Sequence, residues 1–488
     1  MPDALQPEQP SFTLDDTLAW LTQPASADPL ADLVQLRQAL LALSNAEVPP
    51  AHRLRIAEIF GPRLQAMHQI VSSLLLEFPQ PLPRSLGDVT QGIMESHGLS
   101  TNILLDAALE LDAAETAPVL RPIGRIGTAA MLELKGRLEL SLFAFGQVPE
   151  ETWNNAWAAL HLSHADAPAT DYAIFGQMLA LSAAQPESFT PRELHYLHTV
   201  LQLFAEPADI LETTPRDDKP YFWLDIDQDA PPVASTRRHP PQSSSLLYFR
   251  FDTLIKALDP VIEQLASGTP AAALGMPKES NQADYLNVLR RVRQSLADPP
   301  KRQFPRRRQS HAVNVCARLS EFWGLLNRAD ESSGEISGWT VINKSPDGCA
   351  LELETGNVSG LMAGAALGMR ESGNSAWRVC VIRWIRGGVA EQIELGLEFM
   401  APEAYPVRIV YGEAAHENLP GLLLPALPKL GRPETLLVGR GRREGREFNL
   451  IMEDSSGKVS LSSCRPSTVI QQTSSIEVFE FERLRTPD

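Results

Sequence analysis

The chain has 488 residues, and at about 150 residues per domain this length predicts roughly three domains. Hydrophobic residues make up 43% and charged residues 21% of the chain, which excludes a wholly disordered or collagen-like protein. With 43 Lys and Arg against 60 Asp and Glu, the net charge is −17, and the whole excess lies in residues 1–300. An acidic chain repels nucleic acids and anionic membranes, so any anion site requires a local basic cluster.

The location of the protein follows from three further features. Crossing a bilayer takes about 20 apolar residues, and the apolar runs are shorter than this; the uncharged, glycine-rich run 358–369, for example, has 12 residues. The first ten residues have neither the basic nor the apolar region of a secretory signal. Four cysteines lie far apart without a CxxC pair, which favours reduced thiols over disulfides or zinc ligation. We expect a cytosolic protein.

Residues 1–215 are predicted to form an α-helical domain, because apolar residues recur there at helical spacing without strand alternation. Candidate helices cover residues 13–22, 28–45, 52–77, 100–113 and 128–145. A stripe of Trp153, Trp157 and Leu160 indicates another, and Thr190 followed by Pro191 favours a later helix start.

Residues 216–300 are predicted to form a mixed α/β connector. Its strands are expected at 221–224 and 246–251. One helix should continue to about residue 267, and a second should cover 283–296 before a pair of prolines.

From residue 301 onward the sequence alternates with period two. Leu351 and Leu353 alternate with glutamates, and the same pattern recurs in the segment 394–399. Such alternation indicates half-buried antiparallel strands, and several of them with Gly-rich turns predict a small closed barrel over 301–412. A second small β domain is predicted over 413–488. The predicted fold class is therefore multidomain α+β, with an N-terminal α-helical region followed by an antiparallel β-barrel and a small β domain.

The strongly basic segment 290–308 contains eight Lys and Arg against one acid. Within it, Arg302 and Arg306 have the spacing RxxxR, and Arg307 follows directly. Three prolines in 299–305 disfavour helix, so we expect an extended arm. Arginine binds phosphate or guanine O6 and N7 through its planar fork and stacks on flat rings. Two arginines on such an arm can hold one compact, flat dianion.

A polar motif with the spacing NxSxxG lies at Asn343, Ser345 and Gly348. Asn343 and Ser345 are two residues apart at a predicted strand end, so their side chains point to the same face. The segment Ser-Pro-Asp-Gly favours a type I turn that ends the strand. An amide and a hydroxyl placed there can hydrogen-bond the edge of a nucleobase. Taken alone, the turn is more simply a hairpin connection and the basic run a solvated face.

Together, an RxxxR arm before a small β-barrel and an (D/N)xSxxG motif between its early strands resemble the PilZ domain. That family binds the bacterial second messenger cyclic di-GMP. The strands at 380–388 and 393–407 also resemble the closing strands of the family, so the resemblance covers about residues 301–410. One departure is a long insert between Leu319 and Gly338 with a helix-like segment.

The resemblance implies a ligand-binding role for each motif residue. The arm residues would clamp phosphates and guanine faces, namely Arg302 and Arg306, with Arg307 substituting or assisting. The motif residues would hold the other guanine, namely Asn343, Ser345 and Gly348.

The implied function is that of a bacterial cytosolic cyclic di-GMP receptor, which is not an enzyme and needs no cofactor. Its helical region would be an output or would bind a protein partner; neither nucleic acid binding nor membrane insertion is expected. Two alternatives remain. A degenerate PilZ-like adaptor would bind only protein, and an RNA-binding protein would use the basic arm. The intact NxSxxG motif argues against the first, and the acidic body argues against the second.

Other candidate sites are weaker. His161 with His164, and His195 with His198, have HxxH spacing, but no third metal ligand is evident, so no metal site is predicted. The segment Gly439–Gly445 is interpreted as a charged hairpin turn, because it matches neither GxGxxG nor a P-loop. No motif in the sequence argues for catalysis.

Overall fold

The computed structural model describes most of the chain, and the chain divides into two compact units. The described residues are 14–23, 29–113, 123–163, 168–204, 208–211, 213–276, 282–301, 304–328, 335–373, 376–387, 393–411, 418–428, 431–440, 447–453 and 457–484. The first unit comprises the residues up to Lys301, except Phe78–Leu82 and Glu187–Thr190. Those two short segments and Arg302–Asp488 form the second unit. In the described part of the chain, no helix combines the length and the apolarity that a membrane span requires.

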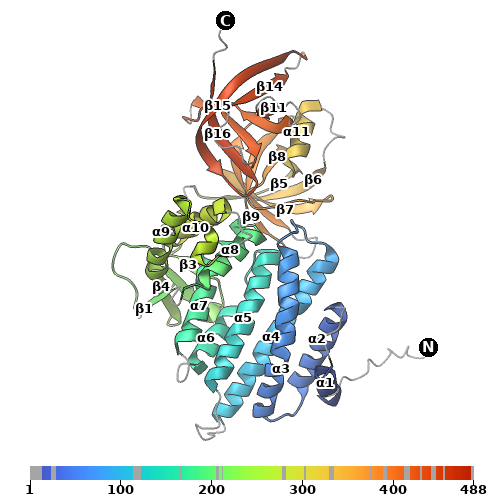
Figure 1. Ribbon diagram of the computed structural model, residues 1–488, viewed down its shortest axis with the longest axis vertical. Helices are drawn as coiled ribbons and strands as arrows, with labels where there is room; N and C mark the ends of the chain where they lie inside the picture. The colour runs from blue at the N-terminus through green and yellow to red at the C-terminus, as the bar shows by residue number, and fades with distance from the viewer. Residues whose placement is uncertain are drawn as a thin grey trace, which may run out of the picture. The chain divides into compact units, whose positions relative to one another are not determined.

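Long helices that lie side by side make up most of the first unit (Figure 1). Its N-terminal helices are α1 (Leu14–Leu21), α2 (Pro29–Asn45), α3 (Pro50–Leu75), α4 (Arg84–Ala113), α5 (Ile123–Phe145), α6 (Thr152–Ser163), α7 (Pro168–Ala183) and α8 (Pro191–Leu201). Helix α3 illustrates why they form. Pro50 occupies the first turn, where no intrahelical N–H bond is lost, and buried residues such as Phe60, Leu64 and Val71 recur at helical spacing.

Helix α4 begins at Arg84, whereas the sequence pattern predicted its start near residue 100. Its first half contains glycines, which local propensity counts against a helix. In the structure these glycines permit close helix packing. A Cβ at Gly92 would lie 3.1 Å from Leu33 of α2, and one at Gly98 would lie 3.5 Å from the guanidinium of Arg137 on α5.

The rest of the first unit contains a small antiparallel sheet and two helices. The strands are β1 (Asp209–Leu211), β2 (Phe222–Asp225), β3 (Val233–Ala234) and β4 (Leu246–Arg250), in the order β1-β4-β2-β3. The helices are α9 (Asp252–Ala266) and α10 (Gln282–Ala297). Strands were predicted at the positions of β2 and β4, and helices at those of α9 and α10, so the sequence pattern located these four elements.

The second unit contains two closed six-stranded antiparallel barrels. The first has the strand order β10-β7-β6-β5-β8-β9. Its strands are β5 (Arg307–Cys316), β6 (Ile336–Ser345), β7 (Gly348–Thr355), β8 (Ala366–Glu371), β9 (Arg378–Arg386) and β10 (Glu394–Ala401). Alternate residues of these strands fill the interior, among them Trp339, Leu351 and Leu395, none of which is exposed. The predicted period-two alternation therefore corresponds to the inner and outer faces of this barrel.

The second barrel has the order β11-β12-β13-β16-β15-β14. Its strands are β11 (Tyr405–Tyr411), β12 (Asn418–Leu424), β13 (Thr435–Gly439), β14 (Phe448–Glu453), β15 (Val459–Gln472) and β16 (Ile476–Arg483). Helix α11 (Leu319–Arg328), which is the helix-like insert of the sequence, contacts β8 of the first barrel and β11 and β12 of the second. Its Phe322 ring lies against Gly368 so closely that a Cβ there would be 2.3 Å away.

The predicted fold class is confirmed, since an α-helical N-terminal part is followed by an antiparallel β-barrel and a second small β domain. The domain limits taken from the sequence remain a prediction. In the structure β10 ends at Ala401, and β11, which begins at Tyr405, pairs with β12 and β14 of the second barrel.

Candidate functional site

Strand pairing brings the end of the basic arm next to the polar motif. The arm leads directly into β5, whose first residue, Arg307, lies opposite Lys344 of β6. The next residue, Arg308, lies opposite Asn343. Residues opposite each other in an antiparallel pair have Cβ atoms about 5 Å apart. The two motifs, about 40 residues apart in sequence, therefore meet at one end of the β5–β6 pair.

The alternation of β6 places Asn343 and Ser345 on the outer face of the barrel. Lys344, between them, pairs with Cys349, which belongs to the barrel interior. The two neighbours of Lys344 therefore point outward. The side-chain oxygen of Asn343 is buried and has no hydrogen-bond partner among the described residues. Ser345 Oγ lies 3.2 Å from the carbonyl oxygen of Gly348, to which it donates. Asn343 thus presents an unused acceptor beside the arm.

Gly348 begins β7 directly after the predicted turn at Pro346 and Asp347. A Cβ at Gly348 would lie 2.1 Å from the carbonyl oxygen of Leu397 on the neighbouring strand β10. No larger residue fits without moving that backbone, since real Cβ contacts are never this short. Gly348 is therefore a packing requirement of the turn, which holds Asn343 and Ser345 in place.

The arm itself is exposed where it is described. Arg306 and Arg307 are exposed, whereas Arg302 lies outside the described residues. Burial raises the pKa of the Cys349 thiol to about 12, and the positive charges of Lys344, Arg378 and Arg306 oppose this shift. Arg306 directly precedes Arg307, which pairs with Lys344, so Arg306 lies at the same end of the barrel as Lys344.

A row of outer-face residues that sequence reasoning missed continues from Asn343 across three further strands. Asn343 pairs with Ala350 of β7, Ala350 with Gly396 of β10, and Gly396 with Trp384 of β9. Neighbouring strands are about 4.8 Å apart. The indole of Trp384 covers Gly396, where a Cβ would lie 1.9 Å from its Nε1. An aromatic ring thus flanks the motif, and only the strand order reveals this.

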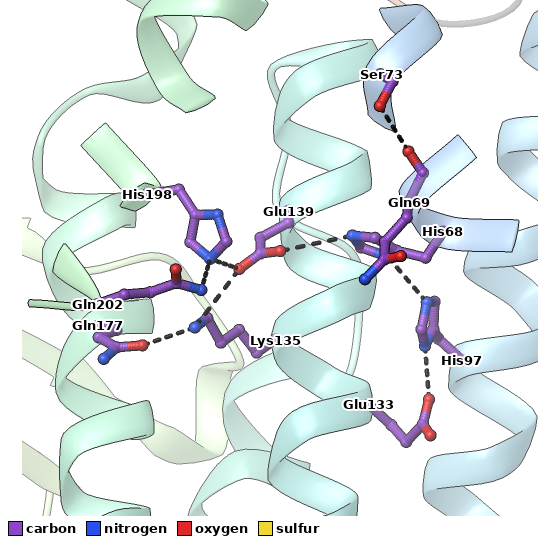
Figure 2. Close-up of polar contacts among 10 residues, drawn as sticks. All are labelled: His68, Gln69, Ser73, His97, Glu133, Lys135, Glu139, Gln177, His198 and Gln202. Carbon is purple, nitrogen blue, oxygen red and sulfur yellow. Dashed lines mark hydrogen bonds and ion pairs between the residues drawn. The ribbon is translucent and has the colours of Figure 1, made fainter. Parts of the chain in front are cut away.

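One of the two HxxH candidates belongs to a buried ion-pair cluster of the first unit (Figure 2). His198 Nε2 lies 2.7 Å from one carboxylate oxygen of Glu139, and His68 Nε2 lies 3.6 Å from the other. Lys135 Nζ is 3.8 Å from the same carboxylate. Burial raises the pKa of the Glu139 carboxyl, but His198, His68 and Lys135 together hold it well below its ordinary value.

In the other candidate pair, His164 lies outside the described residues, and His161 Nδ1 lies 3.2 Å from the carbonyl oxygen of Trp157. Within the described ranges, no group of three or more His, Cys, Asp and Glu side chains could hold a metal ion. All four cysteines are free and buried.

Three family models match successive parts of the chain. Residues 15–215 match the family model of the N-terminal domain of the cyclic-di-GMP receptor FimW. Residues 326–406 match the middle PilZ domain of FimW, and residues 405–484 match its C-terminal β-barrel domain. The chain contains a PilZ domain of the FimW type. The resemblance to the PilZ family is therefore confirmed.

The limits of the FimW matches agree with the observed motif and barrel positions. The PilZ match contains Asn343, Ser345 and Gly348, and the match to the C-terminal domain begins at residue 405, where β11 starts. A curated relative, the cyclic-di-GMP receptor FimW of Pseudomonas aeruginosa, is 29% identical over 132 residues. The aligned part is 26% of this chain and 22% of the relative, so the chain spans about a fifth of the length of the curated relative it matches.

Proposed function

We propose that the chain is a cyclic di-GMP receptor rather than an enzyme, and that its ligand binds where the arm meets the outer face of the PilZ barrel. Arg302, Arg306 and Arg307 would contact phosphates and guanine faces. Asn343 and Ser345 would contact a guanine edge, with Gly348 holding their turn in place.

The observation that carries this proposal is the β5–β6 register. It sets Arg308 opposite Asn343 and so brings the basic arm to the polar motif. The unused side-chain oxygen of Asn343 supports it, since a buried acceptor without a partner costs about 1–3 kcal/mol and a ligand donor would recover part of that. Guanine offers such donors on its Watson–Crick edge, at N1 and N2.

Charge supports the same conclusion. The ligand has two phosphates, and arginine binds phosphate in a bidentate geometry. The first 300 residues carry all of the excess negative charge, so a small dianion is favoured at the basic arm and repelled elsewhere. A long nucleic acid would instead need a broad basic surface.

The arm also suggests how binding is passed to the helical unit. Lys301 is the last residue of the first unit and the main part of the second begins at Arg302, so the arm is one of the chain segments that connect the two units. A ligand that fixes the arm against β6 would restrict this connection. It can shift the balance between states only by its difference in affinity for them. Hydrogen–deuterium exchange with and without cyclic di-GMP should show protection of the peptides that cover 299–308.

Calorimetric titration of the full chain tests the proposal directly. Cyclic di-GMP should bind with a micromolar or lower Kd, whereas GTP and a short RNA should not bind. Arg306→Ala should abolish binding and leave the Tm near that of wild type. Arg290→Ala is a matched control, because Arg290 belongs to the same basic run but lies exposed on α10, and it should bind normally.

The other outcomes select the alternatives. If RNA binds and both arginine variants weaken it equally, the basic run is a general nucleic acid surface. If neither nucleotide nor RNA binds, the barrel is an adaptor for protein. A pull-down with and without cyclic di-GMP then tests whether the helical unit binds a protein partner, which we expect to depend on the ligand.

A further inference from the structure

Strand register places a second charged group at the proposed ligand site, on the inner face of the barrel. The group consists of Lys344, Arg307, Glu371 and Arg378. Each of these residues lies opposite a residue whose side chain faces inward, or opposite another residue of the group, so its own side chain faces inward too. Lys344 pairs with Cys349, and Arg307 pairs with Lys344. Glu371 pairs with Val313, and Arg378 pairs with Met369. Cys349, Val313 and Met369 all belong to the barrel core.

Glu371 is the anion of this group and Lys344 is its main partner. Lys344 Nζ lies 2.5 Å from Glu371 Oε1, and His311 Nε2 lies 4.0 Å from the same oxygen. Lys344 is the main cause of a lowered pKa of Glu371, with smaller contributions from His311 and Arg378. The Arg378 guanidinium in turn lies over the ring of Phe399, 4.4 Å from its centroid. The side chains of Lys344 and Glu371 are 27% and 40% exposed, so they reach solvent at the end of the barrel, where a phosphate of a ligand held by the arm can compete for Lys344.

The Lys344–Glu371 pair lies next to both the NxSxxG motif and the basic arm. Lys344 is the residue between Asn343 and Ser345, and its other strand partner is Arg307 of the arm. Lys344 contacts Glu371, and Arg378 pairs with Met369, two residues before Glu371, so these charges share one end of the barrel. Among the described groups whose charges act on Cys349, Glu371 is the one carboxylate; Glu398, which lies opposite Gly348, forms an ion pair with Arg383 instead.

We propose that Glu371 is an internal counter-anion of the nucleotide site. It neutralises Lys344 in the free protein and so keeps the strand ends of β5, β6 and β8 together despite their positive charges. An incoming ligand phosphate competes with it for Lys344. Glu371 thereby raises the ligand concentration at which the receptor responds, and Lys344 is a further ligand-binding residue. This inference rests on the proposed function, whose ligand it shares.

Calorimetric titration of the full chain with cyclic di-GMP tests the inference. Glu371→Gln should bind about threefold to tenfold more tightly than wild type, and the gain should shrink at high salt because the effect is electrostatic. Lys344→Met should bind about tenfold more weakly. Glu447→Gln, which removes an exposed ion-paired carboxylate from the second barrel, should leave the Kd unchanged.

The double variant Lys344→Met/Glu371→Gln decides the case if a single variant is unstable, because it leaves neither charge unpaired. Its Kd should be about tenfold weaker than that of wild type, as expected for Lys344→Met alone, because Glu371 acts on the ligand through Lys344 and has nothing to neutralise once Lys344 is gone. A double variant that binds as tightly as wild type, or a Glu371→Gln Kd no tighter than wild type, would overturn the inference. Absence of binding by the wild-type chain would instead overturn the proposed function, so the two failures are distinguishable.

Discussion

Trp384 of β9 covers Gly396 of β10 so closely that a Cβ on the glycine would lie 1.9 Å from the indole Nε1. The contact ties the two strands together on the outer face, in the row that leads to Asn343. An aromatic ring fixed in this position can stack on a purine, a contact that is worth about 1–3 kcal/mol in other nucleic acid sites.

Gly396→Ala should therefore displace the indole. We expect a loss of about 1–3 kcal/mol in the free energy of unfolding from overpacking, together with weaker binding of cyclic di-GMP and a shifted tryptophan emission spectrum. Gly324→Ala is the control, because Gly324 lies in α11 with no atom near its Cβ position, and it should be neutral or stabilising. Unchanged stability and binding in Gly396→Ala would show that the ring is not held as described.

Asn343→Ala should separate ligand binding from stability. The unpartnered oxygen contributes no hydrogen bond within the described protein, so its removal should not lower the Tm. Binding of cyclic di-GMP should weaken about tenfold, the value of one hydrogen bond. Asn314→Ala, on the outer face of β5 opposite Arg370, should bind as wild type does. A lower Tm without a change in Kd would make Asn343 a structural residue.

Glu139→Gln should strongly destabilise the helical unit, because it removes the buried carboxylate that Lys135 and His198 contact, at a cost of about 3–5 kcal/mol. Since the pKa of Glu139 lies below its ordinary value, its contribution is fully present above the ordinary carboxyl pKa and is lost as the pH falls toward the folded-state pKa. Urea unfolding of wild type and variant should show a difference that shrinks from pH 7 to about pH 3.

The matched control is Glu110→Gln. Glu110 pairs with Arg53 but is 54% exposed, so its loss should change the free energy of unfolding by less than about 1 kcal/mol at any pH. Equal effects of the two substitutions would contradict a special role for the buried cluster.

The cysteines should be unreactive in the folded protein. Burial raises the pKa of both Cys316 and Cys349 to about 12, and it raises that of Cys380 well above its ordinary value. The thiolate is the reactive form, so alkylation at pH 8 should be very slow. Mass spectrometry after iodoacetamide treatment should find all four cysteines modified only in denaturant. Rapid modification of a single cysteine in the native protein would contradict this burial.

The sequence predicted where the strands and helices lie along the chain better than it predicted which of them are neighbours in the fold. Period-two alternation located β7 and β10, the turn after Asn343 and Ser345 located the end of β6, and the quoted strand at 380–388 contains most of β9. The pattern could not show that Gly396 lies beside Trp384, because strand order depends on contacts between distant segments. The first half of α4 was not predicted, because its glycines have low helix propensity. In the structure, close packing between helices outweighs that local free-energy cost.

The sequence predicted some features of the candidate site and missed others. Asn343 and Ser345 were expected to share a face, and the strand pairing agrees. Lys344 stood in the quoted motif but received no role, because only its register with Cys349 shows that it faces inward toward Glu371. His198 was considered as a metal ligand because its spacing was visible, whereas its partner Glu139 lies on another helix.

Closure of both sheets in the second unit limits how this protein can associate. Each described barrel strand pairs with two neighbours, so neither sheet has a free edge strand, although the first part of β5 pairs with β6 alone. Side chains and loops are therefore the main surfaces through which this part of the chain can recognise partners, and the most direct way to change partner specificity is surface substitution that leaves the ladders intact.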